Sequence, residues 1–145
     1  MKTLIILIGI VMLGVLTPAA IATQRTARGV VTTHRSSLGR ILFDGRGFAL
    51  YAFTKDGRGR SSCSGACAAA WPPYVVSGSP RAAAGVKQSL LATRRRSDGR
   101  LQVTYGGRPL YYYVGDRAPG QVLCQNVVQF GGTWLVVRPG GTLVR

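Results

Sequence analysis

Three cysteines are the residues whose type and spacing come closest to a chemical site in this chain. Cys63 and Cys67 are separated by three residues, and Cys124 lies far downstream. In an oxidising compartment, an odd number of cysteines leaves one thiol over or pairs it with another chain. A Cys63–Cys67 bridge requires a turn, because residues four apart on a regular helix hold their Cβ atoms about 5 to 6 Å apart, whereas a disulfide needs about 3.5 to 4.5 Å. The sequence predicts a structural disulfide of some pairing, with Cys124 as an alternative partner of either other cysteine.

The alternative use of Cys63, Cys67 and Cys124 is a thiol-redox or metal site, in which an unidentified fourth ligand completes the shell. Other chemical patterns are missing. The cysteine spacing fits neither a c-type haem site nor a thioredoxin-like motif, and no serine lies in a G-x-S-x-G elbow. His34 is the only histidine, and the basic loop 57–62 lacks the lysine of a P-loop. We find no catalytic constellation and expect a non-enzymatic protein without a cofactor.

A set of aromatic and acidic residues occurs twice along the chain. Residues 50–56 and 110–116 share the pattern L-Y-x-aromatic-x-x-D. The repeated positions are Tyr51, Phe53 and Asp56, then Tyr111, Tyr113 and Asp116. Because residues two apart in a strand face the same side, the aromatics of each copy are expected to point inward as core residues, with a ligand-stacking platform as the alternative. The aspartates lie next to glycines, and we interpret them as turn caps or arginine partners rather than as a general acid and base.

The elements that must position these residues are predicted to be β-hairpins. Residues 39–44 and 48–54 flank one glycine-rich turn, and residues 101–105 and 109–114 flank another. Each hairpin is followed by a cysteine-bearing loop and a tryptophan-led apolar run, at residues 71–76 and 134–137. The alanines of residues 64–70, with a proline just after the tryptophan, predict one short helix. The predicted fold is mainly β, an antiparallel sheet or small barrel-like domain built from two duplicated hairpin repeats.

Composition supports this fold class and excludes others. The chain has 145 residues, of which 20 are glycine and none is glutamate. This composition argues against a helical bundle, and the length sets a ceiling of one compact domain. The hydrophobic fraction of 46% argues against a disordered tail.

The charge balance is strongly basic, with 19 lysines and arginines against four aspartates. One interpretation is attachment to polyanions such as anionic cell-envelope polymers, lipid headgroups or extracellular DNA. The other is a compositional bias towards arginine that keeps the surface soluble. No nucleic-acid-binding motif accompanies the charge, so we expect no sequence-specific nucleic-acid partner. The polyanion-binding candidates are Arg58, Arg60, Arg94, Arg95 and Arg96.

The first 22 residues have the layout of a secretory signal peptide. Lys2 precedes an apolar run over residues 4–16, and the small-residue triplet 20–22 forms an A-x-A cleavage site. We expect export with cleavage after Ala22. The alternative is an uncleaved membrane anchor, because residues 3–24 carry no charge and are long enough to span a bilayer. The domain prediction is a signal peptide at 1–22, a flexible basic arm at 23–37 and one β domain at 38–145.

The duplicated motif, the Cys63/Cys67 pair, the Trp71-Pro72-Pro73 sequence and the late Gly-Gly-Thr-Trp of residues 131–134 occur together in this order. In this combination the chain resembles the bacterial predicted lipoproteins called secreted repeats of unknown function, which carry a Yx(FWY)xxD motif. The resemblance covers residues 38–145 and implies an extracytoplasmic protein that is secreted or cell-surface-associated. It brings no catalytic residues. Within it, we place the repeats at about 38–80 and 100–145, joined by a basic connector.

Overall fold

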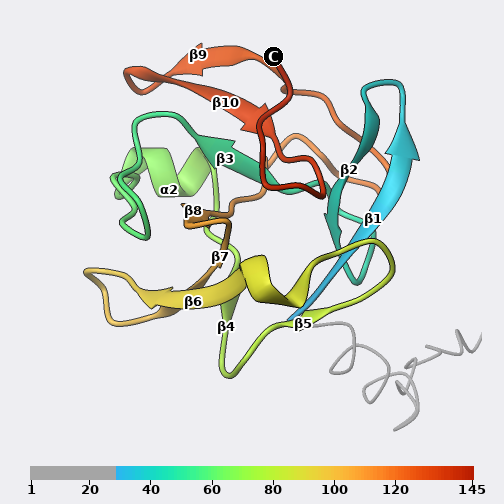
Figure 1. The fold of residues 1–145 in the computed structure, drawn as a ribbon. Coiled ribbons are helices and arrows are strands. Elements are labelled where there is room, and N and C mark those ends of the chain that lie inside the picture. Colours follow the sequence, from blue (N-terminus) through green and yellow to red (C-terminus); the bar gives the residue numbers. More distant parts are fainter. Residues whose placement is uncertain (1–28) are drawn as a thin grey trace, which may run out of the picture.

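The structure is a computed structural model that describes residues 29–145, so the expected signal peptide and its cleavage site lie outside the described residues. Within this part, the protein is mainly β, with three antiparallel-based sheets and a single short α-helix (Figure 1). The prediction of a mainly β fold with two hairpin-based repeats is therefore confirmed, although the sheets do not close into a barrel. No helix among residues 29–145 is long and apolar enough to cross a membrane.

The first sheet has the strand order β2-β1-β5. It contains β1 (Val30–Ser36), β2 (Gly39–Asp44) and β5 (Arg81–Ala82). Strands β1 and β2 form a long antiparallel hairpin, and β5 adds to β1 in parallel. The structure differs here from the flexible arm predicted at 23–37. From Val30 onward the chain is a strand, because Val31 and Thr33 alternate into the core while His34 and Arg35 point to solvent.

The second sheet has the strand order β3-β10-β9, with β10 in the centre at the top of Figure 1. It contains β3 (Tyr51–Phe53), β10 (Gly132–Val136) and β9 (Val127–Gln129). Strand β10 pairs antiparallel with both neighbours. The tryptophan-led apolar run at 134–137 thus lies mostly in β10, which pairs with β3 of the first repeat as well as with β9.

The third sheet has the order β4-β7-β6, and β8 also pairs with β7. It contains β4 (Val75–Val76), β6 (Leu91–Arg95), β7 (Leu101–Tyr105) and β8 (Arg108–Pro109). The predicted connector between the repeats therefore includes a full strand, β6, which pairs with β7 over five residues. The three consecutive arginines at 94–96, of which the first two end β6, hid the strand pattern, because Arg94 and Arg95 lie on a solvated edge strand where charged side chains are favoured.

The two repeats exchange segments about an approximate twofold axis. In each one, the run that begins at the tryptophan pairs with the other repeat. Strand β10 pairs with β3, and the segment carrying β4 pairs with β7. Equivalent hydrogen bonds have the same length: Leu42 N donates to Val137 O at 2.9 Å, and Val103 N donates to Tyr74 O at 2.9 Å. The repeats therefore share one fold and are not two independent domains.

The helix lies in the loop that carries the first two cysteines. Helix α2 (Ala66–Ala70) ends at Trp71, close to the helix predicted at 64–70. A 3-10 turn, η1 (Gln88–Leu90), precedes β6. The buried apolar residues form two clusters, of which one contains both tryptophans and all three cysteines. The other cluster is built on the hairpin leucines and valines of both repeats. Both clusters draw on both repeats, so each depends on the exchange of strands.

Candidate functional site

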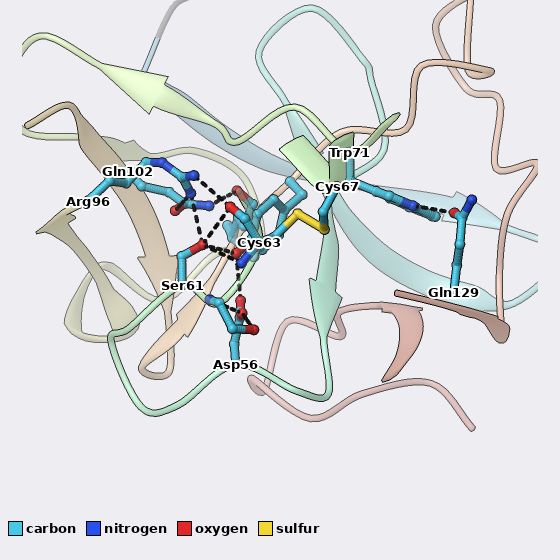
Figure 2. The surroundings of a disulfide bond; sticks show 11 residues. Asp56, Ser61, Cys63, Cys67, Trp71, Arg96, Gln102 and Gln129 are labelled. Carbon is cyan, nitrogen blue, oxygen red and sulfur yellow. Dashed lines mark hydrogen bonds between the residues drawn. A yellow bond between two sulfur atoms is a disulfide. The ribbon is translucent and has the colours of Figure 1, made fainter. Parts of the chain in front are cut away.

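Cys63 and Cys67 form the disulfide, which resolves the open pairing (Figure 2). Their Cα atoms lie 5.3 Å apart. The turn that this bridge requires is supplied by Gly65, whose φ of 54° lies in the left-handed region that glycine adopts without strain. Helix α2 starts only after this turn, so Cys63 lies outside the helix. The two half-cystines are 1% and 7% exposed. Such burial favours a structural rather than an exchanging disulfide.

Cys124 is a free thiol buried in the same apolar cluster. Burial raises the pKa of the Cys124 thiol, which keeps it protonated at neutral pH. The alternative of a metal site with three thiolate ligands does not fit this structure, because two of the three sulfur atoms are joined to each other. Among residues 29–145, no group of three or more histidine, cysteine, aspartate or glutamate side chains is placed to hold a metal ion.

The loop that carries Cys63 is fastened to the second repeat by Arg96. One terminal nitrogen of Arg96 donates to the Cys63 carbonyl at 2.7 Å, and the other donates to Ser61 Oγ at 2.9 Å and to Gln102 Oε1 at 2.7 Å. Figure 2 shows Arg96 and Gln102 on one side of the disulfide and Trp71 with Gln129 on the other. The Arg96 side chain is only 4% exposed. The Arg96 guanidinium therefore binds acceptors inside the protein and does not face solvent.

Removing the disulfide is expected to lower the free energy of unfolding by about 2 kcal/mol, the loop-entropy value for a closed loop of about five residues. The change is the double substitution Cys63→Ala/Cys67→Ala, measured by urea unfolding. Cys124→Ala is the matched control, because it removes a buried sulfur and keeps the bridge. A reductant should lower the urea midpoint of the wild type and of the control. An unchanged midpoint under full reduction would show that the bridge contributes nothing.

The two copies of the repeated motif meet at the twofold axis. Tyr51 and Tyr111 pair across it, each donating its backbone N–H to the other's carbonyl at 2.9 Å. Their side chains then reach the aspartate of the opposite repeat. The Tyr51 hydroxyl donates to Asp116 Oδ2 at 2.7 Å, and the Tyr111 hydroxyl donates to Asp56 Oδ2 at 2.7 Å. Each motif therefore donates one hydroxyl to the aspartate of the other repeat and accepts one from the tyrosine of that repeat.

Each of these aspartates also holds its own turn. Asp56 Oδ1 accepts the backbone N–H of Ser62 at 2.7 Å and its hydroxyl at 2.9 Å. Asp116 Oδ1 accepts the backbone N–H of Leu123 at 2.9 Å. Both carboxylates are thus engaged on both oxygens, which supports the turn-cap interpretation and leaves neither free to move a proton to a ligand.

A stack of four aromatic rings runs between the repeats. Trp71 and Trp134 lie face to face, with centroids 4.0 Å apart and planes 2° from parallel. Phe53 covers the outer face of Trp134 at 4.2 Å, and Tyr113 lies against Trp71 at 4.8 Å. Each outer ring belongs to the opposite repeat from the tryptophan it covers. Both tryptophans are fully buried. Of the repeated aromatics, Tyr51, Phe53 and Tyr111 are core residues, whereas Tyr113 is half-buried and packs against the core from its edge.

The electrostatics of the motif follow from burial. Burial raises the pKa of Asp56 and of Asp116 above the usual aspartate value. Burial and the hydrogen bond to a carboxylate raise the pKa of Tyr51 and of Tyr111 well above the usual range, so both hydroxyls stay protonated as donors. A tyrosine held in this way is a poor general base or nucleophile near neutral pH.

These shifts predict an unusual dependence of stability on pH. Because the folded-state pKa values of Asp56 and Asp116 are raised, their contribution is fully present below the unfolded aspartate pKa of about 3.9 and is lost as pH rises through the folded values. Thermal unfolding of the wild type and of Asp56→Asn/Asp116→Asn from pH 3 to 7 measures this. The wild type should lose stability relative to the variant as pH rises. A relative gain would mean that the fold favours the ionised carboxylates. Asp98, whose pKa is lowered by Arg100, is present in both proteins and cancels.

The five polyanion-binding candidates fall into two groups. Arg58 and Arg60 are exposed on the loop that follows Asp56, and Arg94 and Arg95 are exposed at the end of β6. Arg96 is buried in the network around Cys63. The structure therefore leaves four of the five accessible to a partner.

Sequence reasoning missed the role of the Arg96 network. Gln102 is 1% exposed in the middle of β7, although its place between Leu101 and Val103 fits an outward-facing position. Strand β7 is central in its sheet, with neighbours on both sides and both faces covered. The one signal available was a lone glutamine in an otherwise apolar or β-branched strand, which indicates a polar group needing a buried partner.

Comparison with known proteins agrees with this architecture. The family model described as "secreted repeat of unknown function" matches the chain twice, over residues 32–74 and 92–138. The second match begins at residue 92, inside β6, so it includes most of this strand. Neither a curated protein nor a solved structure matches the chain. The two matches together cover more than half of the sequence, and the family is described as secreted, which supports an extracytoplasmic location. The chain thus belongs to the family of secreted repeats of unknown function.

Proposed function

We propose that this exported protein is a non-enzymatic module that binds anionic polymers of the cell envelope through exposed basic side chains. The observation that carries the proposal is the distribution of ion pairs. Residues 29–145 hold 16 of the 19 basic side chains and all four aspartates. Among these 16 described side chains, only Arg46, Arg96 and Arg100 have an aspartate within ion-pair distance. The other basic side chains of the described residues keep an uncompensated charge.

The four aspartates offset only a small part of this charge, and each is engaged in the fold. Asp44 is 2% exposed and caps its turn by accepting the backbone N–H groups of Arg46 and Phe48. Asp98 holds Arg100 in a tight turn. Asp56 and Asp116 accept the motif tyrosines. A polymer with closely spaced negative charges would therefore meet little local repulsion.

The proposed contact surface consists of Arg58, Arg60, Arg94 and Arg95. The two pairs come from different repeats, and a backbone hydrogen bond of 2.7 Å from Gly59 N to Gly107 O holds the first loop against the β7–β8 turn. Attachment by charge would keep the protein at the cell surface, on anionic wall polymers or lipid headgroups. The alternative means of attachment is an anchor formed by an uncleaved signal segment.

The test is binding of the exported protein to immobilised polyphosphate at increasing salt, with neutral dextran as the control polymer. Exposed charges interact over a Debye length of about 10 Å at 0.1 M salt and about 3 Å at 1 M, so binding should weaken steeply between low and high salt. The variant Arg58→Gln/Arg60→Gln/Arg94→Gln/Arg95→Gln should bind more weakly with a shallower salt dependence. Salt-insensitive binding, or none at 20 mM salt, would overturn the proposal.

A further inference from the structure

A hollow of about 330 Å³ lies where the first repeat's basic loop meets the second repeat. Its polar lining comes from Arg58, Ser89, Arg94 and Thr104, together with the backbone of Gly59 and Gly107. Arg58 and Gly59 belong to the loop after Asp56, Ser89 belongs to η1, Arg94 to β6 and Thr104 to β7. No aspartate lines this hollow. The site therefore combines positive charge and hydroxyl groups from both repeats.

Two glycines bring the arginines together. A Cβ atom at Gly59 would lie 3.0 Å from Arg94 Nε, and a Cβ atom at Gly107 would lie 2.9 Å from Arg58 Cγ. The Arg94 side chain thus lies on Gly59, and the Arg58 side chain lies on Gly107. These glycines are joined by the hydrogen bond between the repeats. Both arginine side chains therefore cross the same backbone contact, and neither has a carboxylate within ion-pair distance among the described residues.

Thr104 adds a feature that a merely charged surface would not have. It is 2% exposed and is the fourth of the five residues of β7, yet its hydroxyl makes no hydrogen bond to another described residue. Thr104 lines the hollow. A threonine that lines a basic hollow and has no hydrogen-bond partner among the described residues can donate its hydroxyl to a bound oxygen atom.

We propose that this hollow binds a phosphoryl group, held by the guanidinium groups of Arg58 and Arg94 and by the Thr104 hydroxyl. Guanidinium groups match phosphate oxygens with paired N–H donors, and charge-assisted bonds of this kind are the stronger ones in proteins. The volume leaves room for the first atoms of the chain that carries the phosphate. This inference rests on the proposed polyanion binding and specifies where a phosphate of the polymer, or of a lipid headgroup, is held.

The neighbouring acid, Asp56, leaves the donors of the proposed site free. Asp56 lines an adjacent hollow of about 160 Å³ that shares Arg58 and Gly107 with the proposed site. Both of its oxygens are occupied, one by Ser62 and one by Tyr111. Its charge lowers the affinity for a phosphate next door without occupying the donors that the phosphate would use.

The experiment titrates the exported protein with sodium phosphate at low ionic strength and follows binding by calorimetry. Arg58→Gln/Arg94→Gln should weaken phosphate binding by about tenfold or more, the effect of losing charge-assisted hydrogen bonds. Arg35→Gln/Arg117→Gln is the matched control, because it removes the same charge from exposed arginines outside both the hollow and the proposed contact surface, and it should change the affinity less than about twofold. Thr104→Val keeps charge and shape, removes the hydroxyl and should weaken binding about threefold to tenfold.

Parallel titrations with polyphosphate and with phosphatidylglycerol vesicles identify the source of the phosphoryl group, because the source should show the same dependence on Arg58 and Arg94. Equal losses from the two arginine pairs, with an unchanged Thr104→Val, would overturn the site and leave general polyanion binding intact. Wild-type protein that binds none of the three would overturn both. Circular dichroism of each variant confirms that it is folded.

Discussion

Replacing Trp134 by alanine is expected to lower the free energy of unfolding by about 3 to 5 kcal/mol, the usual cost of deleting a buried tryptophan. Trp134 is fully buried and lies between Phe53 and Trp71 in the aromatic stack. Its strand also carries the pairing to β3. A domain of this size has a total stability of about 5 to 15 kcal/mol, so the variant should be marginally folded or unfolded at 25 °C. Guanidinium unfolding followed by far-UV circular dichroism measures the loss.

Leu135→Ala is the comparison within the same strand. Leu135 is 2% exposed but takes no part in the stack. It should cost less than Trp134→Ala, within the range of about 2 to 5 kcal/mol for a buried leucine. If the Leu135 variant were the less stable of the two, the stack would not be the main support of the interface between the repeats.

The second large effect is expected on dividing the chain between the repeats. Residues 29–85 and residues 86–145, produced as separate polypeptides, should each be unfolded. The first piece loses β10, the partner of β3, and the second piece loses β4, a partner of β7. Each also loses one of the two stacked tryptophans. The apolar surface that remains is too small to offset the conformational entropy of ordering a chain of about 60 residues.

Mixing the two pieces is the control for this experiment. At equal concentrations they should associate and recover the near-ultraviolet circular dichroism of packed aromatic rings, because every exchanged strand is again present. A cooperative thermal transition from either piece alone would contradict the exchange of segments and would make the repeats independent domains.

The repeated motif made much of the architecture predictable. The patterns at residues 50–56 and 110–116 indicated two hairpin-based repeats with inward aromatics, and the alanine-rich run indicated the helix at Ala66–Ala70. These features depend on local periodicity and on residue propensities, which a sequence displays directly. The order of the elements along the chain also indicates which tryptophan belongs to which repeat, because each tryptophan follows its own hairpin and cysteine-bearing loop.

What the sequence did not display were interactions between distant positions. Nothing local indicates that Tyr51 reaches Asp116 and not Asp56, since the choice depends on the twofold packing. The disulfide pairing depends on the turn at Gly65, which lets Cys63 and Cys67 meet although they are only four positions apart. Arg96 belonged to an apparently solvated run, and its burial follows from buried acceptors brought to it by another loop.

In the proposed function, the repeated motif stabilises the fold and the basic side chains bind the partner. The most direct measurement is the polyphosphate affinity of Tyr111→Phe, which removes only the hydroxyl that reaches Asp56. Losing a hydrogen bond to the half-buried Asp56 carboxylate should lower stability by about 1 to 3 kcal/mol. In the folded variant, polyphosphate affinity should remain within about twofold of wild type, because no charge in the binding surface is altered. A folded Tyr111→Phe protein that no longer binds polyphosphate would contradict the account and identify the motif as the binding site.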